Sequence, residues 1–424
     1  MQKKQGIYAV IAAIAIQIIN GITYIWSVFQ TGVAYSIFGG DNAAAGLTFS
    51  ILILALTISA GIGGKLALRY STRRAVFIGG IIMSVGFLTA SFATESVAWL
   101  LWLSYGVMVG VGMGFTYSTT IACAQKWYPH KKGLITGIII AGFGFSGVIF
   151  TPIVELLISA FGGSGQGGEL RTFMVLGAVS LIVCTVGSIF LKNPPEGYMA
   201  TGAAASNSAA ASTSAANNAV ASDSSNDKTP LQMLKTPQFY LMSVTYLLAC
   251  LAGQMIIAFA RPITVDRGFE AVAALSVILL AVFNSTGRII WGLILDKIGS
   301  SKTILILLLG TAVGSFFVMQ VQGFWVFILI ALIAFFFGGL LVSFPPLTAN
   351  LFGAKNMSAN YGIVLISFGV GAVLASQIAG FYRNRAEYAA DVGLMFPAFV
   401  IAALCAVAGI VMMLILSKMT KRKA

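Results

Sequence analysis

Long apolar runs with few or no charges recur along this chain from one end to the other. They cover about residues 6 to 29, 45 to 68, 74 to 94, 97 to 124, 133 to 160, 171 to 191, 238 to 260, 271 to 295, 302 to 320, 324 to 350, 358 to 382 and 392 to 417. A helix needs about 20 such residues to cross the ~30 Å hydrocarbon core of a bilayer. The runs lack the polar–apolar alternation of membrane-barrel strands. They therefore predict twelve transmembrane helices.

Composition supports this class of protein. With 58% hydrophobic and 9% charged residues, the chain has too little polar surface to cover a soluble globule of 424 residues. We expect an all-α protein embedded in a lipid bilayer. Lys3 and Lys4 followed by an apolar run resemble a signal peptide, but no Ala-x-Ala cleavage site follows, so we expect the first helix to be retained.

The net charge of +13 could suggest a nucleic-acid partner, but the basic residues are distributed as in a membrane protein. If the chain starts in the cytoplasm, nineteen of the 25 Lys and Arg fall on that side: Lys3, Lys4, Lys65, Arg69, Arg73, Arg74, Lys126, Lys131, Lys132, Lys192, Lys228, Lys235, Lys297, Lys302, Lys355, Lys418, Lys421, Arg422 and Lys423. Cytoplasmic loops carry such an excess of positive charge. We therefore expect both termini in the cytoplasm, a multi-pass protein of the plasma or inner membrane, and no nucleic-acid binding.

A segment of small polar residues divides the chain. From Ala200 to Lys228 it is almost entirely Ala, Ser, Asn, Gly and Thr, which is typical of a flexible linker. We expect an N-terminal six-helix bundle over 1–191, a cytoplasmic linker over 192–236 and a C-terminal six-helix bundle over 237–424. The halves also echo each other, since the loop at 64–74 corresponds to the loop at 292–302. Two repeated halves predict a transporter that rocks about a central site.

Arg288 is the one basic residue placed well inside an apolar run. A guanidinium cannot lose its proton, and placing it in hydrocarbon costs from ~3 to well over 10 kcal/mol. Arg288 precedes Asp296 by eight residues, about 12 Å of helix, which predicts a position near the bilayer midplane. A carboxylate accepts two parallel hydrogen bonds from a guanidinium, so we expect Arg288 to bind an organic anion. A structural arginine that holds backbone carbonyls or an internal ion pair is the alternative.

The loop with Gly292, Asp296, Lys297 and Gly299 resembles the Gly-x-x-x-Asp-Arg/Lys-x-Gly signature of the major facilitator superfamily. The resemblance extends over the whole chain and implies the major facilitator fold, twelve helices in two pseudo-symmetric six-helix bundles. It also implies a gating role for Asp296 and Gly299. The N-terminal counterpart has Leu68 in place of the Asp and Ser71 in place of the second Gly, so a gating role of the first loop has no such support.

A narrower resemblance comes from five motifs in order. They are Gly21-Ile-Thr-Tyr-Ile-Trp-Ser27, Lys126-Trp-Tyr-Pro129, Leu234-Lys-Thr-Pro-Gln-Phe-Tyr240, Asn284-x-x-x-Arg288 and Asn360-Tyr-Gly362. Together they are similar to the oxalate/formate antiporter family, which is related to the monocarboxylate transporters. By this resemblance Thr23, Tyr24 and Tyr117 face the substrate, and Asn284 lies one turn from Arg288 on the same face. Helix packing is the alternative for each of these four residues.

Three departures from the family pattern bear on the substrate. Phe368 stands where the resemblance implies a second cation, a lysine, and Phe337 and Leu341 stand where it implies Trp and Tyr. An oxalate dianion facing one arginine would keep an uncompensated charge in a dry site, which costs several kcal/mol. We therefore predict that a small monoanion such as lactate, pyruvate or formate binds among these side chains.

The sequence does not decide whether transport is coupled to protons. Animal-type monocarboxylate/proton symporters resemble the helix of Asn284 but carry Asp at that position, and Asn cannot carry a proton. Glu155 is the one carboxylate within an expected span away from the helix ends, so it is the candidate for proton coupling, although a structural role near the outer interface is the alternative. His130 lies in a cytoplasmic loop. Proton symport and anion exchange both remain possible.

The sequence thus predicts a secondary active transporter of small monocarboxylates that works by alternating access. The alternatives are an oxalate/formate-type dicarboxylate exchanger, an exporter of another organic solute, or a transporter-like sensor or anchor. We expect no enzyme, cofactor or metal site, because no nucleophile and base, metal ligands or phosphate loop stand together. Cys123, Cys184, Cys250 and Cys405 fall inside expected helices and are interpreted as small buried side chains. We expect a monomer.

Overall fold

The chain folds almost entirely into helices. The computed structural model describes residues 2–195, 227–266, 268–269, 272–318, 320–389 and 391–421. Its long helices are α1 (Gln2–Asn20), α2 (Trp26–Ile37), α3 (Asn42–Arg69), α4 (Thr72–Ala90), α6 (Gly110–Trp127), α7 (Lys132–Ala160), α8 (Gly168–Phe190), α11 (Pro237–Asp266), α12 (Ala273–Ile298), α13 (Ser300–Phe317), α14 (Trp325–Phe352), α15 (Met357–Ala389) and α16 (Phe396–Lys421). A shorter helix, α10 (Pro230–Leu234), precedes α11.

The helices match the expected membrane spans. Within the described residues, eleven helices are long and apolar enough to cross a bilayer, and the remaining expected span, 238 to 260, falls in α11. Two spans are more irregular than the apolar runs alone predict. The first passes from α1 into α2 through a 3₁₀ turn, η1 (Gly21–Ile25), and the fourth joins α5 (Trp99–Leu101) to α6 through a π-helical segment, η3 (Trp102–Val109).

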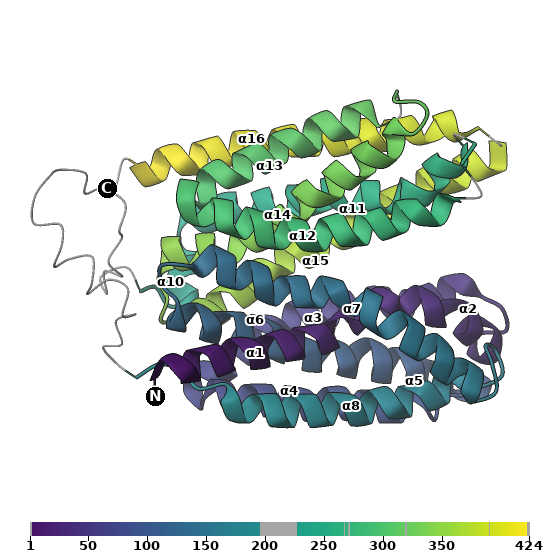
Figure 1. Ribbon diagram of the computed structural model, residues 1–424, viewed down its shortest axis with the longest axis horizontal. Helices are drawn as coiled ribbons and strands as arrows, with labels where there is room; N and C mark the ends of the chain where they lie inside the picture. The colour runs from purple at the N-terminus through teal and green to yellow at the C-terminus, as the bar shows by residue number, and fades with distance from the viewer. Residues whose placement is uncertain are drawn as a thin grey trace, which may run out of the picture.

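The helices form two bundles, one from α1 to α8 and the other from α11 to α16 (Figure 1). Helix α1 begins and α16 ends at the same end of the molecule, here called the termini end (Figure 1). The main contacts between the bundles are made by α7 with α12 and by α3 with α15. In Figure 1 the ribbons of the two bundles lie together at the termini end and are farther apart toward the opposite end.

Glycines make the close contact at the termini end possible. A Cβ on Gly133 would lie 2.5 Å from the carbonyl oxygen of Gly292, and a Cβ on Gly292 would lie 2.5 Å from that of Gly133. Gly64 of α3 likewise packs against the backbone of Ser358 in α15. Farther along α7, a Cβ on Gly147 would meet nothing within 4 Å. Close approach of two helices in a membrane relies on small residues. Gly133, Gly292 and Gly64 therefore mark where the bundles touch, and Gly147 does not.

Asp296 joins the bundles at this end. Its carboxylate accepts hydrogen bonds from the backbone N–H groups of Gly133 (2.8 Å) and Leu134 (2.9 Å), at the start of α7. The first N–H groups of a helix have no partner within the helix, and the helix dipole favours a negative charge there. Asp296 lies within α12, and Gly299 ends that helix with a φ of 85°, a left-handed conformation that suits glycine.

The C-terminal part of the expected linker, from Asp227 on, is fastened to the turn between α14 and α15. Asp227 accepts a hydrogen bond from the backbone N–H of Lys355 (3.2 Å), and the Lys228 carbonyl accepts from the side-chain amides of Asn356 and Asn360 (3.0 Å each). Asn360 of the Asn-Tyr-Gly motif therefore anchors the end of the linker to α15.

Replacing Asp296 with alanine is expected to weaken closure of the termini end, because α7 loses its capping carboxylate from the other bundle. A helix cap contributes about 1 kcal/mol, so the closed population should fall about fivefold relative to open forms. Spin labels at Lys65 and Lys355, which are exposed on different bundles, would report this as a longer distance component.

The matched control is Asp41→Ala. Asp41 also accepts from a backbone N–H at a helix start, that of Ala44 (3.1 Å), but within one bundle. The control should leave the label distance unchanged, and an unchanged distance in Asp296→Ala would contradict the role given to Asp296.

Candidate functional site

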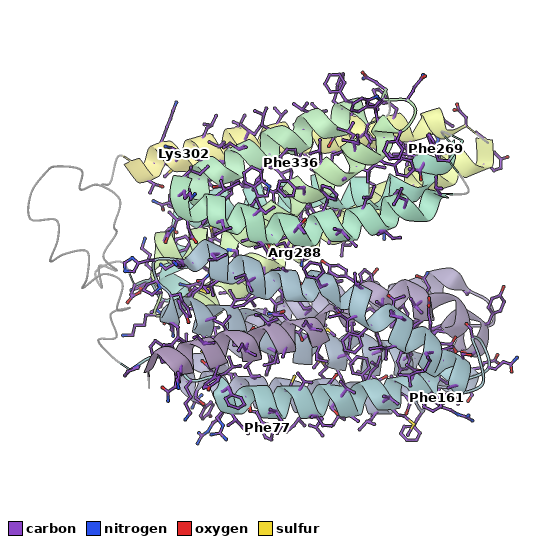
Figure 2. The ribbon with its side chains drawn as sticks, viewed as in Figure 1. Phe77, Phe161, Phe269, Arg288, Lys302 and Phe336 are labelled. Carbon is purple, nitrogen blue, oxygen red and sulfur yellow. The ribbon has the colours of Figure 1, made fainter. Side chains whose placement is uncertain are left out.

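Arg288 lies between the two bundles, about midway along their length (Figure 2). It projects from α12, and only 1% of its surface is exposed. Its position between facing helices, away from lipid, is the one that its charge requires.

All described hydrogen-bond partners of Arg288 are neutral. Nη1 donates to the backbone carbonyl of Ile140 (2.6 Å), and Nη2 donates to the side-chain oxygen of Asn284 (2.7 Å) and to the Tyr24 hydroxyl (3.3 Å). Its Nε has no hydrogen-bond partner among the described residues. The positive charge is thus held by dipoles, with one donor to spare, which leaves it suited to an anionic ligand.

A glycine lets Arg288 reach the Ile140 carbonyl. Gly144 lies four residues after Ile140 in α7, next to the carbonyl on the helix surface, and a Cβ there would lie 3.0 Å from Nη1 of Arg288 and against the Ser285 hydroxyl. Because a carbonyl oxygen has two lone pairs, Ile140 can accept from the guanidinium as well as from its own helix.

Tyr24 is positioned by the η1 turn. Gly21 at the start of this turn packs directly against the Phe143 carbonyl and the Ser146 side chain, which brings η1 close to α7. The Tyr24 ring stands edge-on to Phe143, with centroids 5.0 Å apart, and lies 6.0 Å from the Arg288 guanidinium carbon. Tyr24 is 41% exposed, so it covers the buried arginine from the accessible side.

Tyr117 of α6 also packs against Phe143. It is buried and edge-on to that ring, with centroids 5.7 Å apart. The Gln17 amide donates to the Tyr117 carbonyl (3.2 Å) and the Thr120 hydroxyl (3.0 Å), which ties α1 to α6. Thr23 is also buried, and its hydroxyl donates to the Asn20 carbonyl (3.3 Å), so its place toward a ligand stays a prediction.

The C-terminal bundle holds four of the predicted site residues, and the places of Phe337, Leu341 and Phe368 toward a ligand stay predictions. Asn284 donates to the Ala334 carbonyl of α14 (3.3 Å) while its oxygen holds Arg288. Phe337 and Leu341 of α14 are buried, with Phe337 packed against Gly253 of α11. Phe368 of α15 is half-buried, 5.7 Å from the Tyr246 ring.

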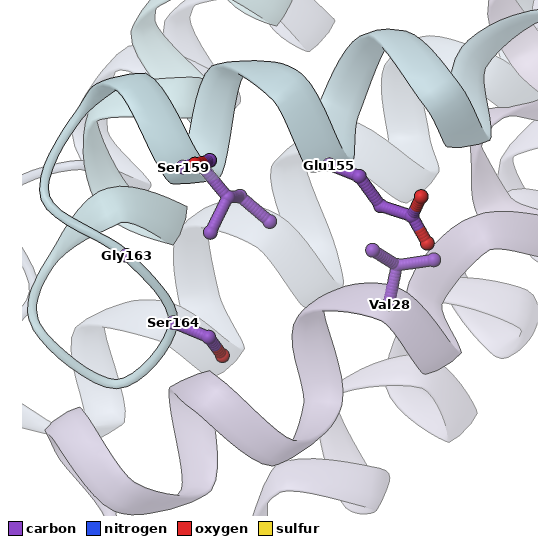
Figure 3. Close-up of a pocket in the computed structure, with 6 residues that line it drawn as sticks. Val28, Glu155, Ser159, Gly163 and Ser164 are labelled. Carbon is purple, nitrogen blue, oxygen red and sulfur yellow. The ribbon is translucent and has the colours of Figure 1, made fainter.

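Glu155 lies away from Arg288, toward the other end of α7. It is exposed near the end of α7 and lines a pocket with Val28, Ile158, Ser159, Gly163 and Ser164 (Figure 3). Glu155 follows Ile140 by fifteen residues, about 22 Å along the helix. Proton coupling through Glu155 would therefore have to act over this distance, and it stays a prediction.

Sequence reasoning did not identify Phe143 or the Ile140 carbonyl as parts of this region. A backbone acceptor leaves no residue-type signal, and Phe143 is one apolar residue among many in its span. The spacing of Gly144 after Gly137 was a usable signal, because small residues four or seven apart mark a face that another helix approaches.

The profile of the Major Facilitator Superfamily matches residues 9–376. The chain therefore belongs to this superfamily and is a multi-pass membrane transporter. The fold agrees, since the proton:xylose symporter XylE superposes with a TM-score of 0.73 at 12% identity, over 97% of this chain and 95% of the other.

Three curated relatives narrow the comparison. The MFS-type transporter YhjX of Escherichia coli is 30% identical over 86% of this chain and 85% of its own length. The oxalate:formate antiporter of Oxalobacter formigenes is 26% identical over 84% and 79%, and monocarboxylate transporter 12 of Xenopus laevis is 25% identical over 81% and 75%. These relatives confirm the resemblance to the oxalate/formate antiporter and monocarboxylate transporter families.

A stability measurement can separate a ligand-binding arginine from a structural one. Arg288→Met is expected to melt within about 2 °C of the wild type in detergent, because the loss of its hydrogen bonds to Ile140, Asn284 and Tyr24 is offset by removal of a buried charge without a counter-ion. The comparison variant is Gln17→Leu, which removes a fully paired amide that joins two helices and leaves buried groups unsatisfied. We expect it to melt several degrees lower. A large loss in Arg288→Met would indicate that the arginine holds the fold.

Proposed function

We propose that the protein transports small monocarboxylates, such as lactate, pyruvate or formate, by alternating access, with Arg288 binding the carboxylate. The observation that carries the proposal is a buried guanidinium between the two bundles whose described partners are all neutral. A carboxylate that took the place of the Tyr24 hydroxyl would gain a charge-assisted bond, and Nε offers a second donor for bidentate binding.

A single negative charge suits this site. Arg288 is the one basic residue placed well inside an apolar run of the sequence, and Phe368, Phe337 and Leu341 stand where the family resemblance implies a lysine, a Trp and a Tyr. A dianion would bring one uncompensated charge into an apolar wall, at a cost of several kcal/mol. The oxalate:formate antiporter among the relatives keeps dicarboxylate exchange as the alternative.

Orientation follows from the distribution of basic residues. We infer that the termini end lies in the cytoplasm, of the plasma or inner membrane, as the positive-inside rule predicts. The contacts of Gly133 with Gly292 and the Asp296 cap then close the cytoplasmic side. Substrate would reach Arg288 from outside, past Tyr24, and would leave after the bundles rock apart at the termini end.

The mode of coupling has two candidates. Asn284 holds Arg288 and cannot carry a proton, while Glu155 is remote from the arginine, so a proton that moves with the substrate would not be stored beside Arg288. Exchange of one anion for another requires no protein proton site. Uptake into proteoliposomes with and without a pH gradient, and with and without internal anion, distinguishes proton symport from exchange.

The experiment that tests the substrate class is uptake of labelled lactate, pyruvate, formate and oxalate by the purified protein in proteoliposomes. We expect uptake of the monocarboxylates and little of oxalate. Efficient oxalate exchange would overturn the single-charge argument. Absence of all four activities in folded protein would overturn the carboxylate proposal.

Two substitutions of Arg288 separate its charge from its geometry. Arg288→Lys keeps the charge but loses the paired donors, so we expect transport to fall at least tenfold. Arg288→Gln loses both and should abolish measurable uptake. Wild-type rates in correctly folded Arg288→Gln would show that another group binds the anion.

The approach of Arg288 to α7 provides a test that leaves Arg288 in place. Gly144→Ala introduces a Cβ 3.0 Å from Nη1, so the guanidinium must shift and uptake should fall about tenfold or more. Gly147→Ala is the matched control on the same helix, because a Cβ there meets nothing within 4 Å. Equal uptake by the two variants would contradict the geometry described for Arg288.

A further inference from the structure

A basic turn lies at the termini end of the N-terminal bundle, where α3 ends and α4 begins. Four of its ten residues, 65–74, are basic: Lys65, Arg69, Arg73 and Arg74. All four side chains are exposed. Lys65 and Arg69 are neighbours on α3, four residues apart, and like charges at this spacing repel each other. An anion bound at this turn, here called the α3–α4 turn, would relieve that repulsion.

No described carboxylate of the N-terminal bundle lies near these charges. Its Asp and Glu residues are all toward the opposite end of the bundle: Asp41, Glu95, Glu155 and Glu169. Within the described part of the chain, none of the four basic side chains forms an ion pair. The Arg69 guanidinium instead lies 5.5 Å from the ring centroid of Tyr70, which is itself 53% exposed. The positive charge of the turn is therefore left for a ligand.

The start of α4 also favours an anion. The Ser71 side chain caps this helix by accepting from the backbone N–H of Arg74 (3.2 Å), and the first turn of the helix contains no acidic residue. The positive end of the helix dipole therefore lies among the arginines. A fifth cation is close by, because the Thr72 hydroxyl donates to the side-chain oxygen of Asn193 (3.3 Å), the residue after the exposed Lys192.

The corresponding turn of the C-terminal bundle, residues 292–302, is different. It holds two lysines, Lys297 and Lys302, together with Asp296, whose carboxylate caps α7 across the interface. In the α3–α4 turn position 68 is a leucine, so the carboxylate is missing and the basic residues are twice as many. The unbalanced charge is thus particular to this turn and is not shared by its repeat.

The helix surface that continues from the basic turn is apolar. Along α4 the side chains of Phe77, Ile78 and Ile81 are 40%, 37% and 37% exposed. Phe77 lies on the side of the N-terminal bundle that faces away from the C-terminal bundle (Figure 2). A free phosphate ion could use only the basic residues. A phospholipid could use both surfaces, with its phosphate at the turn and its acyl chains along α4.

We propose that the α3–α4 turn binds the headgroup of an anionic phospholipid whose acyl chains lie along the exposed face of α4. Clusters of four or more Lys and Arg beside a membrane span attract anionic lipids, and each basic residue adds to the attraction. The orientation inferred above places this lipid in the cytoplasmic leaflet. Gly64, next to Lys65, packs against Ser358 of α15, so the lipid binds beside a contact that joins the two bundles. The proposal does not depend on which solute is transported.

The test compares phosphatidylglycerol with phosphatidylcholine of the same acyl chains, bound to the purified full-length protein and measured by native mass spectrometry. We expect the wild type to bind phosphatidylglycerol at least tenfold more tightly. The triple variant Arg69→Gln, Arg73→Gln and Arg74→Gln should lower this preference at least fivefold. Replacing the same three arginines with lysine keeps the charge and should keep the preference. Because all three side chains are exposed, we expect both variants to fold, and their melting temperatures check this.

The matched control is the triple variant Lys297→Gln, Lys302→Gln and Lys355→Gln. It removes the same net charge from exposed positions at the same end of the C-terminal bundle, and it should keep the wild-type preference. An equal loss of preference in the control would show that net charge alone attracts the lipid, and would overturn the proposal. Full preference in the arginine-to-glutamine variant would overturn it too. Displacement of phosphatidylglycerol by an equal concentration of inorganic phosphate would show a phosphate site without a lipid-binding surface, which also contradicts the proposal.

Discussion

A permanent positive charge buried between two apolar bundles is the constraint on which the rest of the site depends. Arg288 cannot lose its proton, so the surrounding helices must supply acceptors. They supply the Ile140 carbonyl, the Asn284 side chain and the Tyr24 hydroxyl, all neutral. These dipoles make burial tolerable without neutralising the charge. An anion that enters between the bundles is therefore attracted to Arg288 and does not have to displace an ionic partner.

The two pairs of helices that join the bundles at the termini end, α7 with α12 and α3 with α15, are held by different interactions. Between α7 and α12, the Asp296 carboxylate caps the start of α7 across the interface. Between α3 and α15, position 68 is a leucine, and the described hydrogen bond runs from the Ser358 hydroxyl to the Gly64 carbonyl. The carboxylate near the start of α15 comes from Asp227 of the expected 192–236 linker and not from the opposite bundle. One side is thus held by a charge and the other by close backbone packing.

Much of the fold could be predicted because a membrane imposes its thickness on the sequence. The length of each apolar run predicted a helix, and the motif at Asp296 predicted the superfamily. The site was predictable only in part. Arg288 stands out by its charge, and Asn284 follows from helical spacing. Phe143 carries no such signal, because an aromatic residue within an apolar span is also expected in any packed helix.

The sequence by itself determined the class of protein. The length of each apolar run predicts a membrane span, and the distribution of basic residues predicts which loops face the cytoplasm. Both are local properties of the chain and need no tertiary contacts. The sequence also singled out the buried charge. Only the tertiary structure decided what surrounds that charge. The acceptor at Ile140, the approach permitted by Gly144 and the contact of Tyr24 with Arg288 all depend on how two bundles, far apart in the chain, are placed against each other. Contacts between distant helices depend on packing geometry, which no single segment of the chain contains.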